Sequence, residues 1–147
     1  HLSLVQAIPL TGAIVVSTPQ DIALADAKKG VNMFQMDSID VPVVGIVENK
    51  SYFIPQDFPE KKYYIFGKDG AKNLADQLGI KLLAQIPIVQ SLREASDAGR
   101  PAVLQKNTEI SNSFINFANE VVKVIDKRNN SLPSTEAVKI TNMKGCS

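Results

Sequence analysis

The sequence predicts an α/β fold in which helices connect the strands of a parallel sheet. Three apolar runs, at residues 13–17, 41–47 and 82–88, are continuous rather than alternating, as in strands that are covered on both faces. Stretches with apolar residues at helical spacing separate these runs. Strand and helix therefore alternate along the chain, which favours parallel strands with right-handed crossovers.

Composition limits the classes of function. The 147 residues are 44% hydrophobic and 21% charged, as in an ordinary globular domain, and one domain is expected. With 16 basic and 15 acidic residues the net charge is +1, which gives no electrostatic case for nucleic acid or an anionic membrane as a partner. No apolar run approaches the roughly 20 residues of a membrane span.

The use of cysteine bears on the compartment. Cys146 is the single cysteine, so no internal disulfide framework can form. No signal segment opens the chain, and we expect the cytoplasm. The chain begins at His1 without Met, and residues 2–8 have the spacing of a helix that Pro9 ends. We expect this to be the end of a helix whose beginning is missing.

The first β-α-β unit starts at the strand 13–17. Thr18 is predicted to cap the following helix, with Pro19 at its first position and Asp21 at its third. The helix should run to about Met36. Its sheet-facing residues are expected to be Ile22, Ala25, Val31 and Phe34.

The second strand, Val41 to Val47, ends in Glu48, Asn49 and Lys50. Ligands of open α/β sheets bind at the carboxyl ends of the strands, so Asn49 is the first candidate binding residue. Its planar amide can pair with N6 and N7 of adenine. A guanine reader of the Asn-Lys-x-Asp type needs a carboxylate where this chain has Tyr52. Alternatively, Asn49 only caps the strand end through a side-chain to backbone bond.

Later elements follow the same signals. Residues 61–66 are expected to be a short extended edge piece, and 71–78 a helix that Gly79 ends. Residues 82–88 form the third strand, weakened by Gln85 and Pro87. A short helix is expected from Ser91 to Ala98, closed by Gly99.

The last helix has the clearest pattern. Thr108 is its predicted N-cap. Its apolar stripe consists of Ile110, Phe114, Phe117, Val121, Val124 and Ile125. We expect two parts in the chain: residues 1–127 as one folded unit, and 128–147 as a disordered tail without periodicity.

Several catalytic and binding motifs are absent from the sequence. There is no G-x-x-x-x-G-K-[ST] phosphate loop, and GKDGAK at 67–72 has its letters in another order. One His and one Cys cannot supply a metal site of three or four such ligands or a catalytic triad. Arg93 and Asp97 stand four residues apart, as in a surface ion pair rather than an active site.

An aromatic cluster follows the second strand. Tyr63, Tyr64 and Phe66 lie beside Lys61 and Lys62, so base stacking is one interpretation. No wider basic surface accompanies them, and packing in the core or at an edge is favoured.

Uncommon strings at matching spacing resemble the carboxyl-terminal half of the Mrp family over about residues 1–103. They are TPQDIAL at 18–24, AKKG at 27–30, VPVVGIVEN at 41–49 with SYF at 51–53, IFG at 65–67 with GA at 70–71, and SLREASDAGR at 91–100. Mrp proteins are P-loop ATPases of the deviant Walker A class, related to MinD and to the nitrogenase iron protein, and are regarded as iron–sulfur cluster carriers. The resemblance implies an incomplete P-loop NTPase fold of the SIMIBI type, with 1–127 as the carboxyl-terminal half of an ATPase domain.

The resemblance also implies a nucleotide site. Asn49 would take the adenine edge, with Ile86, Pro87 and Ile88 as the apolar wall against the ring. ATP and Mg²⁺ would be the cofactors of the complete protein, whose phosphate loop would precede His1. This chain alone should then not hydrolyse ATP. Apo iron–sulfur proteins and a second copy of the chain would be its partners.

The chain departs from the family at two places. Family members commonly hold a C-x-x-C pair in the loop that here runs from Ile54 to Lys61 without Cys, which puts cluster binding by the usual ligands in doubt. The usual Met after Glu-Asn is Lys50, which we expect to point to solvent.

Two other functions stay open. The chain could be a non-catalytic interaction or dimerisation module that uses the open strand edge at 13–17. A MinD-like ATPase that docks on membranes is the third, but the tail is too poorly amphipathic to favour it.

Overall fold

The computed structural model describes residues 2–55, 57–58, 60–105 and 108–138. In chain order the elements are α1 (Leu2–Ala7), β1 (Ala13–Ser17), α2 (Asp21–Phe34), β2 (Val43–Phe53), α3 (Gly70–Leu78), β3 (Leu82–Ile88), α4 (Gln90–Asp97), a 3₁₀ turn (Ala102–Leu104) and α5 (Glu109–Ser131). The strands form a parallel sheet in the order β1-β2-β3. The predicted α/β fold with helical crossovers is confirmed.

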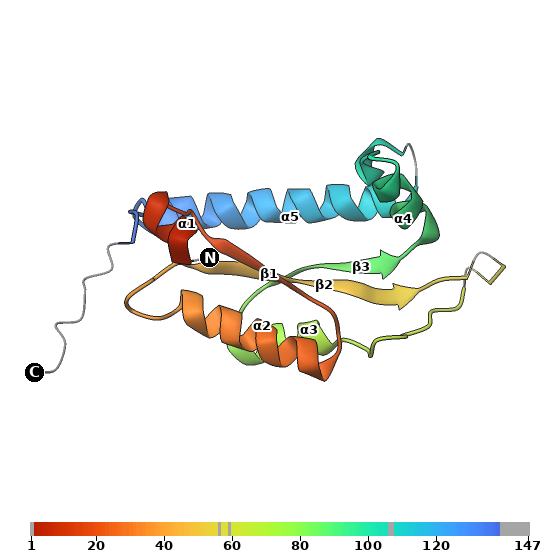
Figure 1. The fold of residues 1–147 in the computed structure, drawn as a ribbon, viewed down its shortest axis with the longest axis horizontal. Helices are drawn as coiled ribbons and strands as arrows, with labels where there is room; N and C mark the ends of the chain where they lie inside the picture. Colours follow the sequence, from red (N-terminus) through yellow and green to blue (C-terminus); the bar gives the residue numbers. More distant parts are fainter. Residues whose placement is uncertain (1, 56, 59, 106–107, 139–147) are drawn as a thin grey trace, which may run out of the picture.

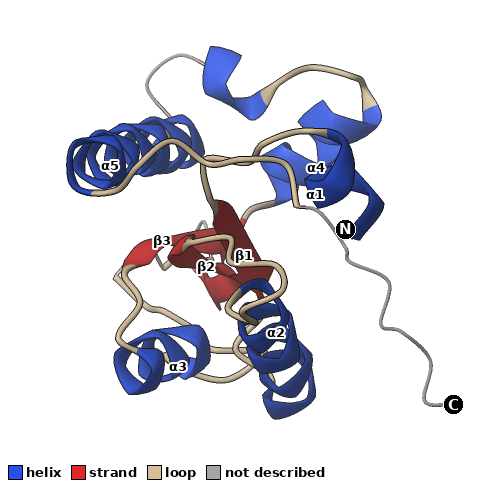
Figure 2. Cartoon of the chain, turned by 90° about the vertical axis from the view of Figure 1, so that its left-hand side faces the viewer, coloured by secondary structure: helices blue, strands red, loops and turns tan. Residues whose placement is uncertain are grey.

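The sheet lies between two layers of helices. Helices α2 and α3 cover one face, and the long α5 runs across the other (Figures 1 and 2). Because neighbouring residues of a strand point to opposite faces, Ile46 packs with Ala27 and Leu74 on the α2–α3 side. Val47 packs with Ile110 of α5 on the other side. Each such buried aliphatic side chain contributes about 1.5–3 kcal/mol, so the central strand holds both layers together.

A third cluster closes the amino end of the sheet. It contains Val5 of α1, Phe34 of α2, and Ile39 and Val41 from the segment before β2. Val138 packs against it, and its backbone N–H donates to the Val5 carbonyl over 2.9 Å. The carboxyl-terminal segment therefore lies on the folded body as far as Val138.

Helix α2 differs from the prediction at both ends. It starts at Asp21 with Gln20 as N-cap, and Thr18 Oγ1 instead donates to Gln20 Oε1 over 3.0 Å. Pro19 is buried against the loop before α3, which keeps it out of the helix. The helix ends at Phe34 rather than Met36.

The sheet-facing stripe of α2 is also partly different from the one expected. Val31 and Phe34 are buried as expected, but Ile22 is 79% exposed and Ala25 is exposed. Ala27 is buried in the core, and Leu24 packs against it. The stripe lies on positions 24, 27, 31 and 34, so 22 and 25 fall on the solvent side of a 3.6-residue helix.

Three other elements agree closely with expectation. Helix α3 ends at Gly79, which has a φ of 64°. Strand β3 covers 82–88 in spite of Pro87, because it pairs only with β2 and needs no donor on its outer side. Thr108 caps α5 and accepts the Ser111 N–H over 3.2 Å.

Helix α5 continues beyond residue 127, where we expected the folded part to end. It reaches Ser131, and Arg128 within its last turn is buried. The expectation of a disordered tail is therefore not met for residues 128–138, which have a described and partly packed conformation. Residues 139–147 of that prediction, with Cys146, lie outside the described residues. No helix within the described part has the length and apolar character that crossing a membrane requires.

Candidate functional site

The candidate site lies where β1 ends and β2 continues. The last residue pair between these strands joins Ser17 to Glu48, and Asn49 is the next residue of β2. The prediction that the second strand stops before Asn49 is wrong, because β2 continues to Phe53. In this part of β2, Asn49 is the register partner of Ile86 and Phe53 that of Ile88, both on β3. Asn49 thus sits at the rim of β1 but inside a strand, which fixes its backbone.

Asn49 makes a local bond through its carbonyl oxygen. Oδ1 accepts the Lys50 N–H over 2.9 Å, and Lys50 has a φ of 55°, in the left-handed region. This is the side-chain to backbone bond of the alternative interpretation. It uses one lone pair of Oδ1 and leaves the two amide donors without a partner among the described residues. The two interpretations of Asn49 are therefore compatible.

A cavity of about 660 Å³ runs along the open edge of β1 and over α2, and Asn49 lines it. Such a volume is within the range of small-molecule sites. Its other lining residues come from β1 and the turn after it (Ile14, Val15, Val16, Ser17, Thr18) and from α2 (Ala23, Asp26, Ala27, Gly30, Met33, Phe34). The cavity brings Asn49 together with the unpaired edge of the sheet.

The three residues of the expected apolar wall lie elsewhere. Ile86 is 4% exposed and packs with Val47, Leu83 and Ile110 beneath α5. Pro87 is buried and Ile88 is half-buried. None of the three lines the cavity that contains Asn49, although Ile86 is the register partner of Asn49 on β3.

A buried carboxylate next to Asn49 was not recognised from the sequence. Glu48 has an exposed fraction of 0%. Its Oε1 accepts hydrogen bonds from Ser51 Oγ and, over 2.9 Å, from Gln85 Nε2, and its Oε2 accepts the Ala71 N–H over 2.7 Å. These donors satisfy a charge that burial would otherwise make very costly. The signal in the sequence was Gln85, a polar residue in an apolar strand, which is the register partner of Glu48.

The Glu48 network holds the loop before α3 against the turn after β1. Gln85 Nε2 also donates to Asp69 Oδ1 over 3.0 Å, and Asp69 has a φ of 56°. A Cβ on Gly70 would lie 2.3 Å from the Pro19 carbonyl oxygen, so only glycine fits this approach. The polar network therefore fixes the loop before α3, and this loop in turn packs closely against Pro19 in the turn after β1.

The other residues considered from the sequence have structural roles. Arg93 Nη1 pairs with Asp97 Oδ2 over 2.9 Å on the exposed side of α4, as a surface ion pair. The described residues contain no group of His, Cys, Asp and Glu able to hold a metal ion.

The aromatic cluster lies at the end of β2. Tyr63 pairs with Phe53 in an isolated antiparallel bridge, which supports edge packing. Lys62 Nζ stands 4.3 Å from the ring centre of Tyr52, and Lys68 Nζ 5.1 Å from that of Tyr64. Lys50 is exposed as expected, with Nζ 5.7 Å from the Phe66 ring centre.

Tyr52, on β2 next to the aromatic cluster, has a perturbed pKa. Burial raises the pKa of its phenol above 10, and the negative charge of Glu109 and the neighbouring Tyr64 add to the effect. Tyr52 therefore stays neutral at physiological pH, and it presents its ring face to Lys62.

Comparison with known proteins identifies the family. A family model described as ParA, the NUBPL iron-transfer P-loop NTPase, matches residues 1–122. The chain is 44% identical over 130 residues to the iron–sulfur cluster transfer protein NUBPL of Dictyostelium discoideum, covering 88% of this chain and 39% of that protein. It is 43% identical over 132 residues to an iron–sulfur cluster carrier protein of Aquifex aeolicus, covering 88% and 35%. The chain thus spans well under half the length of these relatives.

Solved structures agree with the sheet topology. A nucleotide-binding protein of Archaeoglobus fulgidus, in complex with ADP, superposes with a TM-score of 0.54 at 37% identity, covering 61% of this chain and 36% of that one. The cell division ATPase MinD of Pyrococcus furiosus has a TM-score of 0.58 at 23% identity, covering 78% and 43%, which supports the fold alone. From the family match and the identities above, the chain belongs to the NUBPL iron-transfer family of P-loop NTPases, to which the Mrp carriers are related.

Proposed function

We propose that this chain is the base-binding part of an ATP-binding iron–sulfur cluster carrier whose phosphate loop lies on polypeptide outside it. Family membership supports the carrier role, and the ADP complex of the Archaeoglobus fulgidus relative supports nucleotide binding. The observation that supports the proposal most directly is the position of Asn49. It sits at the end of β1, lines a cavity of suitable size, and keeps its two amide donors unpartnered within the described residues.

The proposal assigns roles residue by residue. Asn49 reads the adenine edge through its amide. Ile86, Pro87 and Ile88, the wall expected from the resemblance, do not line the cavity, so the proposal gives them no direct contact with the base. Ile86 instead holds Asn49 in place as its register partner on β3. ATP with Mg²⁺ would bind only where a phosphate loop is present, so the chain alone does not hydrolyse ATP. We further predict that the protein is cytoplasmic and forms a homodimer.

Titration calorimetry with Mg-ATP tests the nucleotide role. A longer protein that carries the phosphate loop should bind tightly, and the present chain should bind at millimolar affinity or not at all. Asn49→Ala in the longer protein should weaken binding by about 5- to 150-fold, the equivalent of one bidentate base contact. Asn73→Ala on the exposed side of α3 is the matched control and should have no effect. Unchanged affinity in Asn49→Ala would remove the base-reading role.

The cargo is tested separately. The loop from Ile54 to Lys61 supplies no thiolate, so a carried cluster needs ligands other than the usual pair. Anaerobic reconstitution of the longer protein with iron and sulfide should give the charge-transfer absorbance of a cluster. Absence of these bands would exclude the carrier role and leave the nucleotide role intact.

The second candidate function is a non-catalytic interaction module. It is favoured by the edge of β1, whose outer side pairs with no strand among the residues that the structure describes and carries Val16 at 60% exposure. This candidate predicts that the chain binds a partner strand without nucleotide. If a longer protein with the phosphate loop binds no ATP, the result favours the interaction module over the ATP-binding function.

A further inference from the structure

We infer that a second cavity, at the amino ends of the strands, is a binding site for a ligand with one carboxylate on an apolar body. The cavity has a volume of about 790 Å³. It is bounded by the segment before β2, the last turn of α5 and the carboxyl-terminal segment 132–138. This is the end of the sheet opposite Asn49, so the inference does not rest on the proposed nucleotide site.

The inference depends on the burial and the hydrogen bonding of Arg128. Its side chain lines the cavity and the residue is only 8% exposed. Within the described part of the chain, its Nε is buried without a hydrogen-bond partner, and Nη1 donates only to the neutral Asn129 Oδ1, over 3.3 Å. No carboxylate among the described residues forms an ion pair with it.

A buried guanidinium without a counter-charge is energetically unfavourable, since it loses hydration and gains no ion pair. The donor edge formed by Nε and Nη2 matches the two oxygens of a carboxylate, which is the geometry of a bidentate pair. A carboxylate bound here would therefore satisfy both the charge and the orphaned donor. Because Nε itself is buried, a ligand reaches it only if the guanidinium or a neighbouring wall of the cavity moves.

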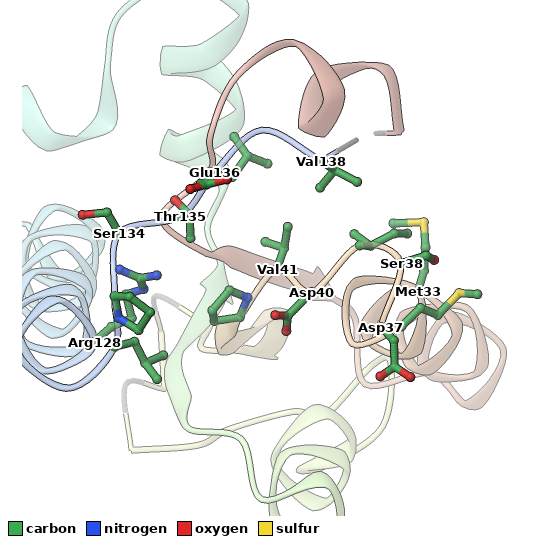
Figure 3. A pocket seen from close by; sticks show the side chains of 16 residues that line it. Met33, Asp37, Ser38, Asp40, Val41, Arg128, Ser134, Thr135, Glu136 and Val138 are labelled. Atoms are coloured by element: carbon green, nitrogen blue, oxygen red, sulfur yellow. The ribbon is translucent and has the colours of Figure 1, made fainter. Parts of the chain in front are cut away.

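The remaining walls define the rest of the ligand. Figure 3 shows Arg128 on one side, below the segment with Ser134 and Thr135, and Met33 and Asp37 on the other. Val41 lies between the two sides, and Leu10, Met33 and Val138 are further apolar lining residues, so the body of the ligand should be apolar.

The acidic residues of the walls limit the ligand's charge. Asp37, Asp40 and Glu136 also line the cavity, and their negative charge opposes a dianion more strongly than a monoanion. A carboxylate is thus preferred over a phosphate. A peptide with a free carboxyl terminus and a medium-chain fatty acid share this chemistry.

The test follows the Arg128 Nε–H signal in ¹H–¹⁵N spectra of the 147-residue chain. The probes are N-acetyl-leucyl-leucine, its carboxyl-terminal amide, octanoate and inorganic phosphate. The carboxylate forms should move the signal saturably, whereas the amide and phosphate should not. Stronger binding of the peptide than of octanoate identifies a peptide terminus as the ligand, and the reverse order identifies a fatty acid.

Two variants separate the charge of Arg128 from its packing. Arg128→Met keeps an apolar stem and should weaken carboxylate binding by at least about tenfold. This variant lacks the Nε–H signal, so its binding is followed through the backbone amide of Val41, which lines the cavity. Exposed Arg93→Met is the control and should bind as the parent does. Asp40→Asn removes a like charge from the wall and should strengthen binding. Asn tolerates the φ of 45° that Asp40 adopts, so this variant tests the inference even if Arg128→Met does not fold.

Four results would overturn the site, and three of them concern the added probes and the variants. They are equal binding of the amide and the acid, unchanged binding in Arg128→Met, or no saturable shift in the folded chain. A fourth is a change of the Arg128 signal on deletion of residues 139–147 alone, which would make the chain's own terminus the occupant.

Discussion

The side-chain amide of Gln85 on β3 donates a hydrogen bond of 2.9 Å to the buried carboxylate of Glu48 on β2. The two residues are register partners, and the same nitrogen also reaches Asp69 in the loop before α3. The polar residue that interrupts β3 is thus paired within the fold. The stability of the rim around Asn49 depends on this pair, because it connects two strands, a helix start and the loop that packs on Pro19.

Replacing Glu48 should show how much this network contributes. Glu48→Gln puts an amide nitrogen against the Ser51 hydroxyl or the Ala71 N–H and leaves a buried donor unpaired. The free energy of unfolding should fall by about 1–3 kcal/mol, measured by urea denaturation. Glu60→Gln, at an exposed position, should change it by less than about 0.5 kcal/mol. Equal losses in the two variants would argue against a buried network.

Two glycine substitutions should have opposite signs. In Gly70→Ala the new Cβ would meet the Pro19 oxygen at 2.3 Å and Leu24 Cδ1 at 2.8 Å, so the loop must move and stability should fall. Gly30→Ala lies within α2 with nothing within 4 Å of the new Cβ. It should raise the free energy of unfolding by about 0.5–1 kcal/mol, because alanine favours the helix. Thermal unfolding of both variants provides the comparison, and a stabilising Gly70→Ala would contradict the close approach.

The start of α5 should be sensitive to its cap. Thr108→Ala removes the acceptor of the Ser111 N–H and should cost about 1 kcal/mol of stability. Ser113→Ala, within the helix, removes a hydroxyl that only donates back to the Glu109 carbonyl. This control should be neutral or slightly stabilising in the same denaturant titration. A Thr108→Ala protein as stable as the parent would show that α5 is held by packing alone.

The surface ion pairs of Glu120 with Lys81 and Lys123 should make the stability of the fold depend on pH. Hydrogen bonds from Lys123, over 2.6 Å, and Lys81, over 2.5 Å, lower the pKa of Glu120 from 4.5 to about 2. A carboxyl whose pKa is lowered by folding stabilises the fold above its unfolded pKa and loses that contribution as the pH falls through its folded pKa. The contribution of Glu120 should therefore be complete above about pH 5 and decline toward pH 2.

Unfolding measured from pH 7 down to pH 2 checks this. The difference in stability between the parent and Glu120→Gln should shrink over that range, and 1 M salt should reduce it at pH 7, since the pair is partly exposed. A difference that stays constant with pH would assign the effect to packing rather than charge.

Local signals in the sequence identified most elements. The positions of β1 and β3, the Gly79 end of α3 and the Thr108 cap of α5 depend on neighbours in the chain, and the structure has them where the patterns placed them. Short sequence motifs that match those of the Mrp family also indicated the family that the comparisons confirm. Asn49 was a candidate because polar residues follow an apolar run there, although β2 itself continues to Phe53.

What the tertiary structure decided is which side chains are exposed and which polar groups are paired. The length of β2, the burial of Ile86 beneath α5, the Glu48–Gln85 pair and the orphaned Arg128 all depend on residues far apart in the sequence. Periodicity reports only the average face of an element, whereas burial and hydrogen bonding depend on the partner that packs on it. The order of strands and helices was thus fixed by local sequence, and the chemistry of both cavities by the packing of distant segments.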